Sequence, residues 1–192
     1  MSFFDLIWQS LFPSLLLALA PLADALVVWQ QGARRHEIAA RLALAGFRPA
    51  DLLLALVLAL AGWAGTAVAL ALLPPEARDA LRAALFPGWR PDSAAALLGL
   101  RATTALAEEL FFRGWLAGLL VRTLGRERGL AAQALASLVP LLPLLLLGPA
   151  LLPLLAAQAG LAWGLGWLRW RSGSILPGGV ARLAAGVLSF EF

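Results

Sequence analysis

The sequence has no cysteine and no lysine, and it has only one histidine among its 192 residues. The absence of cysteine excludes disulfide bonds, thiolate metal ligands and a cysteine nucleophile. One histidine, His36, cannot supply an HExxH motif or a histidine pair, so zinc-protease chemistry is excluded as well. Charged residues are also scarce, at 14% of the chain, where a soluble domain has about a quarter. We expect no metal and no cofactor site, and we interpret His36 as a solvated loop residue.

Hydrophobic residues make up 61% of the chain, and the mean hydropathy is +0.85. Helices that are apolar on every face need lipid or a very large core around them, and this chain is too short for such a core. We therefore predict an all-α fold, a polytopic transmembrane helical bundle that forms one integral membrane domain over residues 1–192. Six apolar segments are each near the roughly 20 residues that cross a hydrocarbon core. They cover about residues 4–29, 52–73, 93–120, 130–147, 151–168 and 175–190.

Two of these segments have unusual boundaries. The first is interrupted by Pro13, Pro21 and Asp24, and we read it as an uncleaved span. The fourth and fifth are separated only by residues 148–150, so they form either a tight helical hairpin or a pair in which one segment is re-entrant.

All 15 basic residues are arginine, and most lie in short loops between the apolar segments. This pattern orients a membrane protein, and no separate basic domain is present to bind phosphates, so we expect no nucleic-acid partner. The loops after the first, third and fifth segments are the arginine-rich ones, and the positive-inside rule makes them cytoplasmic, with both termini outside. Their arginines are Arg34, Arg35, Arg41, Arg48, Arg122, Arg126, Arg128, Arg169 and Arg171. Between the second and third segments, residues 76–85 alternate polar and apolar positions at helical spacing, which predicts an interfacial helix.

Four charged residues lie inside the third apolar segment. Glu108 and Glu109 are near its middle, and Arg101 and Arg113 flank them. A charge at that depth costs about 2.5 to 3.5 kcal/mol, so these side chains should face the bundle interior and pair. Helical spacing lets Glu109 pair with Arg113 four residues on, and it places Arg101, Thr104 and Glu108 on another stripe. Two adjacent carboxylates in a dry site do not both ionise easily, and such a glutamate could act as a general base on water.

The motif Glu108-Glu109-Leu-Phe-Phe-Arg113, followed by glycine, closely resembles the Glu-Glu-x-x-x-Arg motif of the CPBP family. That family of intramembrane glutamic proteases includes the CAAX prenyl endopeptidases and bacteriocin-processing or immunity proteins. The stretch 171–177 resembles the Arg-Thr-Gly-Ser-Leu-x-x-Pro stretch that opens the family's last core helix. The resemblance implies a family-like core over about residues 93–192, with Glu108, Glu109 and Arg113 as the catalytic candidates. It also implies a multi-pass protein of a bacterial inner membrane, surrounded by lipid, with a transmembrane or lipidated protein as substrate or partner.

The rest of the family's catalytic set is missing. Active members have a Phe-x-x-x-His motif on the following helix, and residues 137–144 contain no histidine. They also have a His-x-x-x-Asn or His-x-x-x-Asp motif on the last helix, where this chain has Arg182 and Gly186. An arginine cannot act as a base, because its guanidinium stays protonated, but it can neutralise a carboxylate. If Arg182 points at Glu108, it locks that glutamate into an ion pair. We therefore name Arg101, Thr104 and Arg182 as binding residues around the glutamates.

The intramembrane charges balance, with Asp24 and the two glutamates against Arg101, Arg113 and Arg182, which suggests a closed charge network. Three interpretations follow. The first is a degenerate family member, a pseudoprotease that binds membrane segments or a partner protein without cutting. The second is an active glutamic intramembrane endopeptidase that uses Glu108. The third is a scaffold subunit of a larger membrane complex, in which the glutamates only hold helices together.

Overall fold

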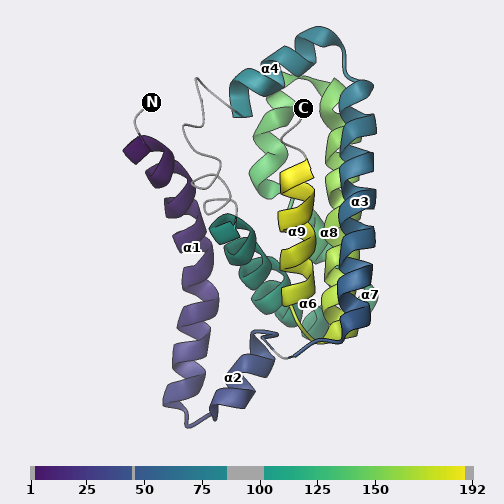
Figure 1. Ribbon diagram of the computed structural model, residues 1–192. Helices are drawn as coiled ribbons and strands as arrows, with labels where there is room; N and C mark the ends of the chain where they lie inside the picture. Colours follow the sequence, from purple (N-terminus) through teal and green to yellow (C-terminus); the bar gives the residue numbers. More distant parts are fainter. Residues whose placement is uncertain (1–2, 45, 86–101, 189–192) are drawn as a thin grey trace.

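Figure 1 shows the computed structural model, which describes residues 3–44, 46–85 and 102–188. The prediction of an all-α fold is confirmed, and the isolated bridge between Leu44 and Ser174 is the only β-type pairing among the described residues. The first part of the chain forms α1 (Phe3–Gln30), α2 (Arg35–Arg41), α3 (Pro49–Ala71) and α4 (Pro75–Leu85). A helix over residues 102–108 continues into η1 (Glu109–Leu116), and then follow α6 (Ala117–Leu124), α7 (Arg126–Ala136), η2 (Val139–Leu147), η3 (Pro149–Leu151), α8 (Leu152–Ser172) and α9 (Leu176–Leu188).

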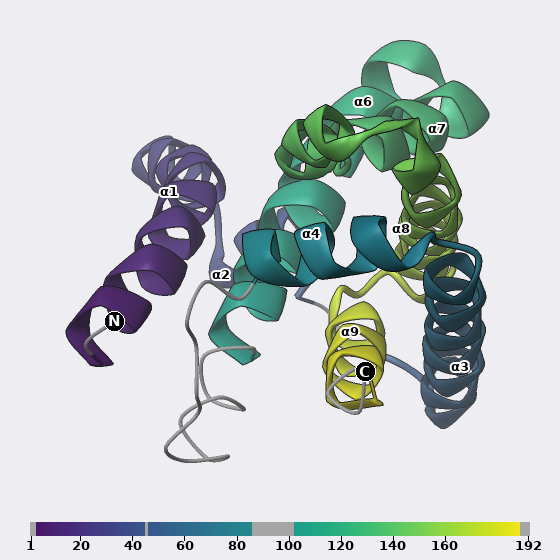
Figure 2. The same ribbon diagram turned by 90° about the horizontal axis from the view of Figure 1, so that it is seen from above.

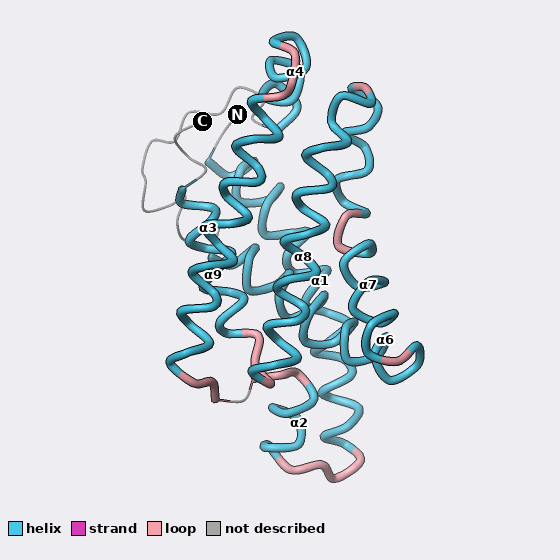
Figure 3. Tube along the Cα trace, turned by 90° about the vertical axis from the view of Figure 1, so that its right-hand side faces the viewer, coloured by secondary structure: helices cyan, strands magenta, loops and turns pink. Residues whose placement is uncertain are grey.

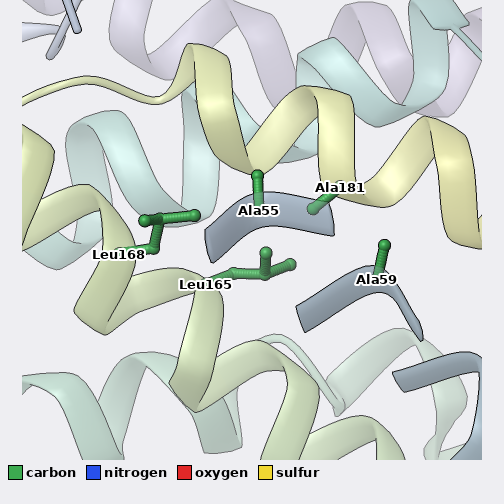
Figure 4. Close-up of a cluster of buried hydrophobic side chains, with 5 residues drawn as sticks. All are labelled: Ala55, Ala59, Leu165, Leu168 and Ala181. Carbon is green, nitrogen blue, oxygen red and sulfur yellow. The ribbon is translucent and has the colours of Figure 1, made fainter. Parts of the chain in front are cut away.

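The core of the bundle lies where α3, α8 and α9 meet. Small side chains on α3 and α9 let the backbones approach closely, which is the usual way that helices pack in a membrane. Figure 4 shows Leu165 and Leu168 of α8 pointing into the space beside alanines of α3 and α9. The fully buried members of this cluster are Ala55, Ala59, Leu165, Leu168 and Ala181. This core fixes the position of α9, which contributes to the site described below.

A second apolar cluster closes the end of the bundle at which α3 finishes. There, α4 runs across the helix ends, as Figures 1 and 2 show. Its apolar side is represented by Leu81, which is 4% exposed, whereas Glu76 and Arg78 are exposed. The predicted amphipathic helix over residues 76–85 is therefore present, one residue longer at its start.

Helix α1 stands to one side of the bundle and packs against η1 and α2 (Figures 1 and 2). It is one continuous helix, so Pro13, Pro21 and Asp24 do not interrupt it as the sequence suggested. Proline inside a membrane helix is tolerated when neighbouring groups satisfy the freed backbone, and Pro21 is fully buried. His36 was predicted to be a solvated loop residue. It is exposed, but it lies in the short helix α2.

By length and composition, two of the described helices can cross a membrane, Pro49–Ala71 and Pro149–Ser172. A third candidate is the pair formed by α7 and η2, which is bent by 50° at the break between them. The break appears as a loop above α7 in Figure 3, and it has a local cause, since Pro140 lies in the first turn of η2 and a proline ring clashes with the helical carbonyl four residues back, here that of Ala136, where α7 ends. The pair is either a broken span or a re-entrant segment, and six crossings stay a prediction.

The two ends of the molecule differ in charge. α1 begins and α9 ends at the same end, while α2, the α6–α7 turn and the α8–α9 turn lie at the other (Figure 1). The second end has nine arginines and only four acidic residues, a surplus of five positive charges, and we call it the basic end. Its arginines are Arg34, Arg35, Arg41, Arg48, Arg122, Arg126, Arg128, Arg169 and Arg171, and its acidic residues are Asp24, Glu37, Asp51 and Glu127.

Candidate functional site, a glutamate–arginine cluster between η1 and α9

The two neighbouring glutamates lie where the α-helix over residues 102–108 ends and η1 begins. From Glu109 to Leu116 the backbone is π-helical, as shown by the amide of Ala117 donating to the carbonyl of Phe112, five residues back. Segments of this kind are rare and are frequently found at functional sites. The sequence predicted a helix here but not this geometry, because the choice between i→i+4 and i→i+5 bonding depends on what the helix packs against.

Glu109 and Arg113 form the fully buried half of the site. Their side chains are 0% and 1% exposed, and Oε1 of Glu109 lies 3.1 Å from Nη1 of Arg113. The pairing predicted from their spacing is confirmed. A buried pair of this kind is strongly destabilised when one partner is removed, because the other charge is then left uncompensated.

Gly178 of α9 makes room for the carboxylate of Glu109. A Cβ atom added at Gly178 would lie 2.5 Å from Oε2 of Glu109, so only glycine allows this approach. At the next residue, Gly179, the nearest atom to an added Cβ is Cδ2 of Leu106, at an ordinary contact distance of 3.5 Å. Sequence reasoning missed Gly178, for which the only signal was the glycine pair at the start of a short apolar helix.

Arg182 lies one helical turn beyond Gly178 and forms an ion pair with Glu108. The conditional prediction that Arg182 points at Glu108 is therefore confirmed. The side chains of Arg182 and Glu108 are 29% and 24% exposed, unlike the buried pair beside them. Arg182 also interacts electrostatically with Glu109, so the two pairs form one cluster with no net charge.

The remaining residues that the sequence assigned to the site or its charge network are Thr104, Arg101 and Asp24. Thr104 lies one turn before Glu108, and its hydroxyl accepts a hydrogen bond of 3.3 Å from Ser14 of α1. Arg101 lies outside the described residues. Asp24 does not complete the expected charge network, because both of its oxygens accept hydrogen bonds from Arg41 of α2, at 2.6 and 2.8 Å. This hydrogen bonding raises the pKa of Arg41 above its ordinary value.

The backbone around Ala43 holds the site helix against the turn before α9. The carbonyl oxygen of Leu42 lies 2.9 Å from where a Cβ of Gly114 would be, so this glycine allows the loop to touch η1. The carbonyl of Ala43 accepts a hydrogen bond of 2.8 Å from the amide of Ile175. Ala43 itself has a φ of 54°, an unusual value for a residue other than glycine. The stretch 171–177, singled out in the sequence, thus positions α9 through its contact with residues 42–44.

Three polar residues outside the site, Gln133, Ser137 and Gln158, have side chains that can form hydrogen bonds between helices. Gln158 does so, donating to the hydroxyl of Thr66 on α3 at 3.1 Å. Ser137 does not, since it donates to the carbonyl of Ala134 in its own helix, as hydroxyls near helix ends often do. Gln133 is fully buried against Gly166 of α8, and its amide has no hydrogen-bond partner among the described residues.

The chemistry open to this cluster follows from its charges. Each glutamate is paired with a guanidinium, which compensates the charge of the carboxylate and cannot itself act as a base. The chain's only histidine, His36, is exposed on α2. No three of the histidine, aspartate and glutamate residues in the described ranges come together as metal ligands do.

The fold defines the class: this is an integral membrane protein of helical architecture. A family model described as type II CAAX prenyl endopeptidase, Rce1-like, matches residues 90–187, about half of the chain. The chain belongs to this family, which is part of the CPBP family. The comparisons with curated proteins and with solved structures gave no match.

Proposed function

We propose that the protein is a catalytically degenerate member of its family, which binds a membrane segment or a partner protein without cleaving it. The observation that carries the proposal is the ion pair between Arg182 and Glu108. Arg182 stands where the resemblance to active family members places a histidine, and Glu108 is the first glutamate of the motif. A guanidinium in that place binds the carboxylate that an active enzyme needs for water activation.

The kinetic cost of this replacement is large. Losing a proton-transfer partner lowers a rate by about 10²- to 10⁴-fold, and losing an oxyanion donor lowers it by roughly 10²- to 10³-fold. Arg182 cannot take over proton transfer at any ordinary pH, and residues 137–144 offer no second histidine. Both losses apply to this chain.

The partial exposure of the Glu108–Arg182 pair supports a binding role. About a quarter of each side chain is accessible, whereas Glu109 and Arg113 beneath them are closed off. A polar group on an incoming membrane segment could therefore interact with the outer pair while the inner pair holds η1 in place. The partner chemistry that fits is a transmembrane or lipidated protein segment with one polar group at this depth.

Reconstituted protein tests the proposal. The pure chain is incorporated into liposomes with a prenylated reporter or a transmembrane reporter, and the products are analysed by mass spectrometry. The proposal predicts no cleavage by the wild-type protein or by Glu108→Gln. Glu127→Gln is the matched control, since it makes the same change at an exposed position on α7.

Each alternative has its own outcome. Cleavage that Glu108→Gln abolishes and Glu127→Gln leaves intact would establish an active glutamic endopeptidase and overturn the proposal. Purification from native membranes addresses the third interpretation. A scaffold subunit co-purifies in fixed stoichiometry whether or not Glu108 and Arg182 are changed, whereas the proposed binder loses its partner in Arg182→Gln.

The proposal also covers the setting of this activity. We infer one integral membrane domain over residues 1–192, in which the family-like core spans about residues 93–192. The location that fits is the inner membrane of a bacterium, with the basic end on the cytoplasmic side.

A further inference from the structure

Two arginines at the basic end converge without an acidic partner. Arg169, in the last turn of α8, extends to α6, where its Nη2 atom lies 3.6 Å from the position of a Cβ on Gly118. Arg122 lies four residues after Gly118, on the same face of α6. The two guanidiniums are close enough to repel each other.

The surroundings do not neutralise these charges. Neither Arg122 nor Arg169 forms an ion pair among the described residues, and Nε of Arg169 is buried with no hydrogen-bond partner. Asp24 is the acidic residue within electrostatic range of Arg122, but both of its oxygens are bonded to Arg41. Each arginine lies in the last turn of its helix, where the helix dipole favours a cation. The dipole does not remove the repulsion between them, which an anion bound to both would do.

The same region is built like a membrane interface. Trp170 of α8 is 44% exposed, and the guanidinium carbon of Arg126 lies 3.5 Å from the centre of its ring. Tryptophan is enriched at the depth of lipid headgroups. On α6, Leu119 lies three residues before Arg122 and is 40% exposed, which provides apolar surface for acyl chains beside the two charges.

We infer that Arg122 and Arg169 form a site for the phosphate of an anionic lipid headgroup between α6 and α8. Basic sites between membrane helices on the cytoplasmic side bind anionic headgroups in this way, and guanidinium groups suit phosphate because they donate two parallel hydrogen bonds. The site is separate from the glutamate–arginine cluster and does not depend on the proposed function. Its occupant is a phosphodiester lipid that enters from the surrounding leaflet.

Native mass spectrometry of the full-length protein in detergent tests this site, with phosphatidylglycerol as the probe. The expected result is that the protein binds phosphatidylglycerol more tightly than phosphatidylcholine, and that Arg122→Gln and Arg169→Gln each weaken this binding about fivefold. Arg35→Gln and Arg128→Gln remove the same charge from exposed positions at the basic end and should change the affinity by less than about twofold. Inorganic phosphate at equal concentration should not compete, because it lacks the acyl chains that bind beside Leu119.

Three results would overturn the inference. The first is equal affinity for phosphatidylglycerol and phosphatidylcholine. The second is an equal loss of binding in all four variants, which would show a diffuse charge effect and no site. The third is full competition by inorganic phosphate. Because Arg169 is partly buried, its variant is also checked by thermal unfolding, and the exposed Arg122 variant carries the test if Arg169→Gln does not fold.

Discussion

At the scale of single residues, the site depends on which atoms are missing as much as on which charges are present. Gly178 has no Cβ, and the carboxylate of Glu109 occupies the space that a Cβ would need. Gly114 gives the same freedom to the carbonyl oxygen of Leu42, which approaches η1 closely. Two glycines, one on α9 and one in η1, therefore allow close approaches around the buried Glu109–Arg113 pair that a larger residue would block.

Gly178→Ala should destabilise the protein by about 1 to 3 kcal/mol, because the new methyl group overpacks against the buried carboxylate of Glu109. The matched control is Gly179→Ala, whose new atom makes only an ordinary contact with Leu106 and whose helix propensity rises. Unfolding in detergent, followed by circular dichroism, measures both. Equal stability of the two variants would show that Glu109 does not occupy the space beside Gly178.

At the scale of helices, α7 and α8 pack closely where a glutamine of one meets a glycine of the other. Gln133 is fully buried against Gly166, and Leu130 lies beside the same glycine. This contact connects α7 to the core helix α8. Glycine is required at position 166, since any side chain there would collide with the amide of Gln133.

Gly166→Ala should push α7 away from α8 and cost about 1 to 3 kcal/mol of stability. Gly160→Ala, on the same helix but in open space, should be neutral or stabilise the protein by up to about 1 kcal/mol, since alanine favours a helix. The midpoints of thermal unfolding in the same detergent compare the two. The interpretation of the α7–α8 contact would be wrong if Gly160→Ala were the more damaging change.

Several helices could be predicted from sequence because apolar length decides them. The segments at 52–73 and 151–168 correspond closely to α3 and α8, although α8 continues to Ser172. The fourth segment is different, because apolar composition does not reveal the change from α-helix to the 3₁₀-helix η2. The π-helical geometry of η1 was equally invisible, since it depends on tertiary packing.

The contacts of the site also fall into those that could be predicted from sequence and those that could not. The Glu109–Arg113 pair follows from spacing within one helix, and the Glu108–Arg182 pair followed from comparing the chain with a family motif. Gly178 and residues 42–44 could not be predicted, because their roles come from contacts between segments that are far apart in the sequence. The prediction that Asp24 belongs to the charge network was wrong for a related reason: its partner, Arg41, was counted as a loop residue.

At the scale of the whole molecule, the uneven distribution of arginine defines an orientation. The basic end has five more positive than negative charges, and the end formed by α4 has no such surplus among its described residues. The positive-inside rule places the basic end in the cytoplasm. The absence of cysteine makes this orientation easy to test, since any cysteine introduced is the only thiol in the chain.

Arg35→Cys and Glu76→Cys should be labelled from opposite sides of the membrane by a maleimide that cannot cross it. Both positions are exposed, one on α2 at the basic end and one on α4 at the far end. Position 35 should react in inverted vesicles and position 76 in right-side-out vesicles. Labelling of both from one side would contradict the orientation.

The central claim is that Arg182 is bonded to Glu108 and so removes the glutamate from catalysis. A double-mutant cycle with Arg182→Gln, Glu108→Gln and the double variant, followed by unfolding in detergent, tests it most directly. We predict a coupling energy of about 1 kcal/mol or more, because each single change leaves a partly buried charge without its partner. Effects that add to within about 0.3 to 0.5 kcal/mol would contradict the claim, since independent residues behave in that way.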